Sequence, residues 1–203
     1  MLPSILDFSL SNPNHGTLFD TRDGQSYPVV KIGKQIWLAE NFRYLPSKEK
    51  GDLHDTSYVY DNDNSYLDKG YGRLYDFNTA NTIAPDGWKL PSNEDFQELI
   101  DFIKKDNNIF SSEVGNYLKS IDCWYPCLGI TNNDKYGFNA KPTGNIGEGE
   151  YDGNFSDIIT CFWCSNNSRV PTDSWTLYCS MGDFVNHQHY QLSYYYSVRL
   201  LKK

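Results

Sequence analysis

A strongly marked helix start in the middle of the chain constrains the fold more than any other feature. Pro91 ends the segment before it, because proline cannot continue a strand ladder. Ser92 is a favourable N-cap residue, and Glu94 and Asp95 put negative charge in the first turn, where the helix dipole stabilises it. Apolar residues then recur at helical spacing, at positions 96, 99, 100 and 103. The pattern predicts a helix from about residue 93 to residue 105.

Trp88 lies just before this helix and just after a weaker helical stripe, which consists of Leu74, Phe77 and Ala80. A large aromatic residue between two helices predicts a core position rather than a binding position. The same reasoning predicts burial for six residues, which are Trp37, Trp88, Leu90, Phe96, Leu99 and Trp163.

Alternating patterns elsewhere predict antiparallel strands. Residues 29–38 place β-forming residues on both sides of a turn at Gly33, which predicts a hairpin with a type II′ turn. Residues 174–180 and 194–200 alternate between two faces. In the last segment we predict that the buried face consists of Tyr194, Tyr196, Val198 and Leu200. Tyr195 then belongs to the opposite face.

Two further segments complete the outline. Residues 46–70 are polar and predict a long surface excursion, and residues 112–121 predict a second short helix. The apolar face of that helix would consist of Val114, Tyr117, Leu118 and Ile121. Neither a break in composition nor an internal repeat divides the chain. We predict an N-terminal extension over residues 1–19 and a single α+β domain over residues 20–203.

The net charge of the chain argues against nucleic acid as a partner, and its hydropathy argues against insertion into a membrane. The 203 residues carry a formal net charge of -8, whereas a general nucleic-acid binder needs clustered Lys and Arg. No apolar run approaches the length that spans a bilayer, so we predict no membrane insertion. Residues 1–10 lack a basic segment and are interrupted by Pro3 and Asp7, so no signal peptide is visible.

Five cysteines permit a metal site without favouring one. Cys123 and Cys127 form one close pair in the sequence and Cys161 and Cys164 form another, so four thiolates could in principle bind zinc. The second pair reads as part of a strand, however, whereas a zinc knuckle needs a tight turn. Cys179 is left over, which makes the count odd. We predict reduced thiols, no disulfide that folding requires, and no metal or other cofactor.

Signals of catalysis are weak. His187 and His189 would share one face of a strand, which leaves open a metal pair with Asp183 as its single candidate third ligand. The chain contains no Gly-x-Ser-x-Gly, no phosphate-cradling loop and no His-Glu-x-x-His. We therefore predict no catalytic residues.

Several blocks of sequence resemble a known family when they are taken together. Asp20–Phe42 looks like the opening of the Fibrobacter succinogenes major paralogous domain, and Gly72–Tyr75 with Gly87–Ser92 looks like its middle. Later blocks of the same family are similar to Tyr136–Gly144, Phe162–Trp163 and Ser197–Leu200. The blocks occur in the family's order. Two departures are Cys164, where the family has small residues, and Leu200, where it often has Cys.

The resemblance implies a fold and a class of function. The fold would be C-type-lectin-like, with two or three helices, a twisted antiparallel sheet and long irregular loops. The same fold serves as the variable protein of diversity-generating retroelements and as a phage receptor-binding tip, which vary Asn, Tyr, His, Asp and Ser residues near the C-terminus. It also serves the formylglycine-generating enzymes, whose reactive cysteine pair cannot be placed on Cys164 or Cys179.

The predicted function is therefore ligand binding, in receptor recognition or adhesion to a protein or glycan. Tyr, Ser and Asn suit such surfaces because they combine rigid aromatic area with adaptable hydrogen bonding. The predicted ligand-binding residues are Asn166, Asn167, Ser168, Trp175, Asp183, Asn186, His187, His189, Tyr190, Ser193 and Tyr195. Alternatives are an enzyme of the formylglycine-generating type and a structural module of a larger surface assembly. The family suggests a bacterial cell surface or phage particle, and the oligomeric state stays open.

Overall fold

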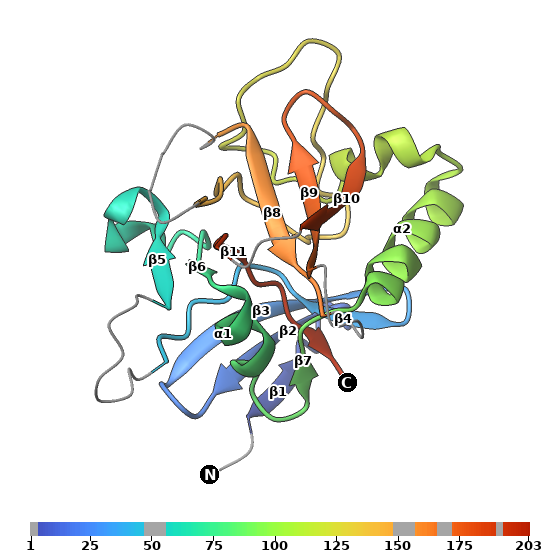
Figure 1. Cartoon of the computed structure of the whole chain (residues 1–203). Helices are drawn as coiled ribbons and strands as arrows, with labels where there is room; N and C mark the ends of the chain where they lie inside the picture. The colour runs from blue at the N-terminus through green and yellow to red at the C-terminus, as the bar shows by residue number, and fades with distance from the viewer. Residues whose placement is uncertain (1–3, 47–55, 148–156, 166–171, 190–192) are drawn as a thin grey trace.

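The computed structural model describes the chain apart from residues 1–3, 47–55, 148–156, 166–171 and 190–192, and apart from the side chains of residues 172 and 187–189. Two six-stranded sheets form its framework (Figure 1). In spatial order the first sheet contains β1 (Ile5–Phe8), β2 (His15–Asp20), β3 (Gln25–Ile32), β4 (Gln35–Leu38), β12 (Leu201–Lys202) and β7 (Trp88–Lys89). The second contains β10 (Phe184–His189), β9 (Thr172–Tyr178), β8 (Ile159–Trp163), β11 (Tyr196–Ser197), β6 (Arg73–Tyr75) and β5 (Ser57–Val59).

Helices pack against both sheets, so the predicted α+β class is confirmed. The α-helices are α1 (Phe77–Thr82) and α2 (Asn93–Asn107), and 3₁₀ turns cover Tyr60–Asn62, Asn64–Tyr66 and Ser111–Tyr117. Neighbouring strands pair antiparallel in both sheets, except that β11 pairs parallel with β8. The chain end returns to the first sheet, where Leu201 lies opposite both Trp37 of β4 and Lys89 of β7.

The predicted central helix is confirmed as α2. The Ser92 hydroxyl accepts the Asp95 N–H at 3.3 Å, and the Asp95 carboxylate accepts the Ser92 N–H at 2.7 Å, which forms a reciprocal capping box. Asn108 ends the helix in the left-handed conformation, with φ of 52°. The buried residues of α2 are Phe96, Leu99, Ile100 and Ile103, as the apolar spacing predicts.

All six residues with predicted burial are buried, but they belong to two clusters. Trp37, Phe96 and Leu99 lie in a cluster between α2, β4 and the inner strands of the second sheet. Trp88 and Trp163 lie in another, which also receives Ala80 of α1 and Tyr196 of β11. The Trp163 ring contacts Tyr196 with a centroid distance of 4.3 Å. The two clusters therefore fill opposite sides of β8.

The predicted hairpin is also confirmed. Ile32 lies opposite Gln35, and Gly33 has a φ of +61°, which a type II′ turn requires at this position. A Cβ atom at Gly33 would lie 2.7 Å from the Phe102 ring of α2. Both the turn conformation and the close approach of α2 therefore require glycine here.

Two helix predictions need correction. Leu74 belongs to β6, because the helix that follows starts only at Phe77. Asp76 caps that helix, and its carboxylate accepts the Thr79 N–H at 2.9 Å. The segment after residue 110 forms a 3₁₀ turn that ends at Tyr117. Ile121 is consequently not on a buried face and is 76% exposed.

Within residues 1–19, which the sequence placed in an N-terminal extension, the chain forms β1 and all of β2 except Asp20, and both strands belong to the first sheet. β2 pairs with β3 over its whole length, from His15 opposite Val30 to Asp20 opposite Gln25. The domain boundary at residue 20 itself stays a prediction. Within the described residues, neither α2 nor any other helix is long and apolar enough to cross a membrane.

Candidate functional site

The structure describes only part of the predicted ligand-binding set. Asn166, Asn167, Ser168 and Tyr190 lie outside the described residues. The backbone of His187 and His189 lies in β10, opposite Ser174 and Thr172 of β9. Asp183, Asn186, Ser193, Trp175 and Tyr195 are described with their side chains.

The described members do not share one surface. Asp183 lies in the connection between β9 and β10, beside the 3₁₀ turn, where its carbonyl oxygen would be 2.8 Å from a Cβ atom at Gly115. Asn186 lies within β10 and faces α2. Ser193 and Tyr195 precede β11, which β8 and β9 separate from β10 in the sheet. The predicted site is therefore divided by the second sheet.

Trp175 is a core residue, which corrects its assignment to the binding surface. It is 6% exposed, and its ring lies 5.6 Å from that of Phe96 and 5.2 Å from that of Phe184. The alternation along β9 places Trp175 and Leu177 on the face that packs against α2. The opposite face of β9 is also largely buried, so the strand offers little aromatic surface to a ligand.

Asn93, the first residue of α2, connects several strands through its side-chain amide. Its Oδ1 atom accepts hydrogen bonds from Trp175 Nε1 at 2.9 Å and from Asn186 Nδ2 at 2.8 Å. The Cys164 thiol donates to the same oxygen at 3.3 Å, and Asn93 Nδ2 donates to Asp173. Asp173 is 3% exposed, and its other oxygen, Oδ1, has no hydrogen-bond partner among the residues that the structure describes. This cluster orients β9 and β10 against the helix start.

Cys164 and Cys161 are unsuited to nucleophilic chemistry. Burial raises the pKa of Cys164, and the nearby charges of Asp173 and Glu94 raise it further. Burial also raises the pKa of Cys161, to about 11. A thiol attacks as its thiolate, so both groups stay protonated and unreactive near neutral pH.

Two partly exposed tyrosines, Tyr58 and Tyr195, form what we name the tyrosine face. The Tyr58 and Tyr195 rings meet edge to face with a centroid distance of 4.8 Å. The backbone of Tyr195 is held by Ile146, with N–H···O distances of 2.9 and 3.2 Å in the two directions. A Cβ atom at Gly147 would lie 3.0 Å from the Tyr194 ring, so glycine permits this close approach. The rings are therefore held in fixed positions at the surface.

A second group of tyrosines follows β5 in the chain. Tyr60, Tyr66 and Tyr71 form a triangle with centroid distances of 4.7, 4.7 and 5.0 Å. Tyr60 and Tyr71 are buried, and the Lys69 ammonium lies 4.2 Å from the Tyr66 ring centroid. The excursion after residue 55 thus has its own small core and presents Tyr58 beside Tyr195. Tyr58 is not among the predicted ligand-binding residues, because no local pattern in the sequence places it against Tyr195.

Comparison with known proteins supports a family assignment. The family model described as the Fibrobacter succinogenes major domain matches residues 30–202. The chain belongs to this family. No curated protein and no solved structure gives a significant match.

The sequence blocks that resemble the family include framework residues of this Fibrobacter succinogenes major domain. Gly72 has a φ of +67°, and a Cβ atom there would lie 2.6 Å from Asn41 Cβ. Arg199 is fully buried. Tyr58 and Tyr195 lie outside the blocks on which the resemblance rests, although the family match covers both residues.

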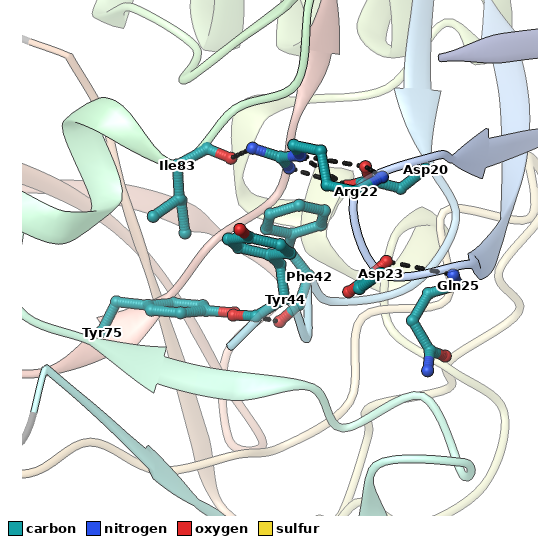
Figure 2. A network of polar contacts seen from close by, with 8 residues as sticks. All are labelled: Asp20, Arg22, Asp23, Gln25, Phe42, Tyr44, Tyr75 and Ile83. Carbon is teal, nitrogen blue, oxygen red and sulfur yellow. Dashed lines mark hydrogen bonds and ion pairs between the residues drawn. The ribbon is translucent and has the colours of Figure 1, made fainter. Parts of the chain in front are cut away.

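An ion pair between Asp20 and Arg22 lies at the edge of the framework (Figure 2). Asp20 is fully buried and accepts hydrogen bonds from Arg22 Nε at 2.9 Å and from a terminal guanidinium nitrogen at 2.7 Å. The other terminal nitrogen of Arg22 donates to the Ile83 carbonyl at 2.8 Å, and the guanidinium lies 4.1 Å from the Tyr44 ring centroid. The adjoining cavity measures about 220 Å³. Because Asp20 neutralises Arg22, we interpret this network as a clamp between β2 and α1.

Replacing Arg22 with alanine should destabilise the domain by about 3 kcal/mol, because it leaves the buried Asp20 carboxylate without its partner. Arg22→Lys should lose part of that stability, since an ammonium cannot form the bidentate contact or stack on Tyr44. Urea unfolding followed by fluorescence measures both values. An Arg22→Ala variant as stable as the parent chain would show that the clamp does not stabilise the fold.

A groove of about 740 Å³ lies between the β3–β4 turn and the outer side of α2. Its lining mixes acidic Glu94, Glu98 and Asp101 with Lys34 and Lys105. The described lining contains no cysteine and none of the predicted ligand-binding residues. Glu94 and Gln97 are exposed helix positions. The groove therefore offers no constellation of catalytic groups.

The cysteine pairs of the sequence do not converge on a metal. Cys127 lies beside Cys179, whereas Cys161 accepts a hydrogen bond from Thr176 and Cys164 donates to Asn93. Among the described side chains, no group of three or more His, Cys, Asp or Glu residues is placed to hold a metal ion. The pairing of His187 with His189 is outside the described side chains.

Proposed function

We propose that this chain is a C-type-lectin-like ligand-binding domain that contacts a protein or glycan through the tyrosine face. The observation that carries the proposal is the edge-to-face pair of Tyr58 and Tyr195, which is partly exposed and comes from segments far apart in the sequence. A receptor-binding or adhesive role at a bacterial surface or on a phage particle fits the family.

The proposed contact mode follows from the rigidity of the rings. Ile146 holds the Tyr195 backbone and Tyr58 supports the Tyr195 ring, so little side-chain entropy is lost when a ligand binds. A tyrosine also combines an apolar ring with a hydroxyl, which suits both sugar rings and protein surfaces. Ser193 is exposed beside them and adds a small polar group. Support for the C-type-lectin-like fold comes from the paired antiparallel sheets and from the chain end, which returns to pair with β4 and β7.

The alternative of a formylglycine-generating type of enzyme has less support. That chemistry needs a reactive thiol at an accessible site, whereas Cys161 and Cys164 are buried with raised pKa values. The third possibility, a structural module of a larger assembly, predicts a stable self-association instead of ligand binding. Size-exclusion chromatography with light scattering distinguishes it from the proposed function.

Alanine at Tyr195 should weaken ligand binding about 30-fold, which corresponds to about 2 kcal/mol for a tyrosine anchor at an interface. The test applies the labelled chain to a glycan array and to a displayed library of bacterial surface proteins, and it repeats the binding with Tyr58→Ala and Tyr195→Ala. Tyr125→Ala is the matched control, because Tyr125 is 61% exposed on a different segment. Circular dichroism confirms that each variant folds.

The two arrays distinguish a glycan ligand from a protein ligand. Retained binding in the Tyr58→Ala and Tyr195→Ala variants, or an equal loss of binding in Tyr125→Ala, would show that the tyrosine face is not the ligand-binding surface. Tyr190, which lies outside the described residues, can be tested in the same series.

A further inference from the structure

Two cysteines that are far apart in the sequence meet at one end of the second sheet. We propose that Cys127 and Cys179 are a modification site, at which an oxidising environment forms a reversible disulfide that fastens the 121–133 segment to β9. The two Sγ atoms lie 3.2 Å apart. A disulfide bond is about 2.05 Å long, so the two sulfur atoms lie about 1 Å beyond bonding distance.

The backbone around both cysteines is held in place. The Cys179 N–H donates to the Ile158 carbonyl at 2.7 Å, and the Cys127 carbonyl accepts the Ile130 N–H at 3.2 Å. Trp124, three residues before Cys127, is buried and donates from Nε1 to the Ala140 carbonyl at 2.9 Å. The two thiols therefore face each other in the folded chain, and their approach does not require local unfolding.

The other cysteines are not equivalent candidates. Cys161 and Cys164 are buried and hydrogen bonded to Thr176 and Asn93, respectively. Cys123 is exposed, and its sulfur lies 3.7 Å from the Lys141 ammonium nitrogen. Cys123 is the natural competitor, because it is only four positions before Cys127 in the sequence. The geometry selects the long-range pair over this short one.

A buried lysine lies beside the pair. Lys119 donates from Nζ to the carbonyls of Tyr178 and Met181, at 3.0 and 2.8 Å, on either side of Cys179. Its positive charge lowers the pKa of Cys179, although burial and the neighbouring Cys127 raise that pKa overall. Cys127 is the more accessible thiol of the two, so it is the one that reacts first with the oxidant. The oxidant is a small-molecule disulfide such as oxidised glutathione.

The chemistry balances in two exchanges. The Cys127 thiol loses its proton to solvent, and its thiolate attacks oxidised glutathione, which forms a mixed disulfide and releases one glutathione thiolate. The Cys179 thiol then loses its proton to solvent, its thiolate attacks Sγ of Cys127 and releases the second glutathione thiolate, and each released glutathione thiolate takes up one proton. The protein loses two hydrogen atoms, and one oxidised glutathione becomes two reduced glutathiones.

The Cys127–Cys179 disulfide would restrain a segment that exposes several apolar side chains. Ile121, Tyr125 and Leu128 are 76%, 61% and 105% exposed, so the 121–133 segment presents apolar side chains to solvent. Few packed side chains hold it besides Trp124 and Cys127. Cross-linking residues 52 positions apart restricts the unfolded chain strongly, which favours the folded state.

The test incubates the folded full chain with an equimolar mixture of reduced and oxidised glutathione, then unfolds it in urea with iodoacetamide so that every free thiol is blocked, and identifies linked peptides by mass spectrometry. We expect one intramolecular Cys127–Cys179 bridge, three alkylated cysteines, and a melting temperature about 5–10 °C above that of the reduced chain. Dithiothreitol should reverse both changes. A reduced chain that folds normally would show that the bridge is additional to the fold.

Matched variants complete the experiment. Cys123→Ser should keep the bridge and the thermal shift, whereas Cys127→Ser and Cys179→Ser should lose both. A Cys123–Cys127 bridge, stable glutathione adducts without an internal bridge, or five alkylated cysteines in the folded parent chain would each overturn the proposal. These outcomes are measured on the parent chain, so they remain decisive even if a serine variant fails to fold.

Discussion

Replacing Arg199 with alanine should lower the free energy of unfolding by about 3–5 kcal/mol, which is enough to unfold many domains. Arg199 is fully buried, and its guanidinium connects three parts of the chain. One terminal nitrogen donates to the Leu38 carbonyl at 3.1 Å and to the Phe138 carbonyl, and the other donates to Asn41 Oδ1 at 2.6 Å. Without the side chain, buried oxygens of β4 and of two loops lose their donors.

The environment of Arg199 explains why no shorter residue can replace it. Burial lowers the pKa of its guanidinium, while the charges of Glu40 and Asp134 partly offset that effect. The Phe138 ring centroid lies 4.5 Å from the guanidinium carbon. Arg199→Lys should recover little stability, because one ammonium cannot reach acceptors in several directions.

Urea unfolding of Arg199→Ala, Arg199→Lys and the parent chain gives the comparison. Arg73→Ala is the matched control, since Arg73 is only half-buried and donates through Nε to the Arg43 carbonyl at 3.2 Å. The control should lose about 1 kcal/mol. If Arg199→Ala and Arg73→Ala unfold at the same urea concentration, Arg199 is not the connecting residue described here.

Trp88→Ala should also cost about 3–5 kcal/mol, as a large-to-small change in the core. Trp88 is 3% exposed and packs in the same cluster as Leu90 and Trp163. It also lies opposite Lys202 in the first sheet, so the cavity would form where the chain end joins that sheet. A loss of stability here therefore reports on the closure of the fold by β12.

A thermal melt measures the effect of Trp88→Ala, with Tyr125→Ala as the exposed aromatic control. The control should change the free energy of unfolding by less than about 0.5 kcal/mol. An unchanged melting temperature for Trp88→Ala would contradict the assignment of Trp88 to the core.

The elements that the sequence predicted well are those with local signals. The start of α2 depends on Ser92 and Asp95, which are three residues apart, and the β3–β4 hairpin depends on the turn at Gly33. Propensity, capping and periodicity act within such short stretches. Leu74 and Ile121 were misplaced because the periodic pattern continued past Asp76 and Tyr117, where capping and tertiary pairing end the helices.

The candidate site could be predicted only in part, because it depends on contacts between distant segments. Composition near the C-terminus indicated Tyr195, but nothing local places Tyr58 against it. Trp175 was misassigned because an alternating strand was assumed to have one exposed face, whereas β9 is buried on both. Central strands of a packed sheet lose that simple relation between alternation and exposure.

Footprinting of tyrosine side chains with and without ligand tests the central claim most directly. Hydroxyl radicals label exposed rings in solution, and mass spectrometry compares each site in the chain alone and in complex with the glycan or surface protein recovered by the arrays. We predict that ligand binding protects Tyr58 and Tyr195 from labelling, whereas Tyr125 is labelled equally in both states. Unchanged labelling of Tyr58 and Tyr195, with protection of Tyr125 or of Phe102 beside the α2 groove, would contradict it.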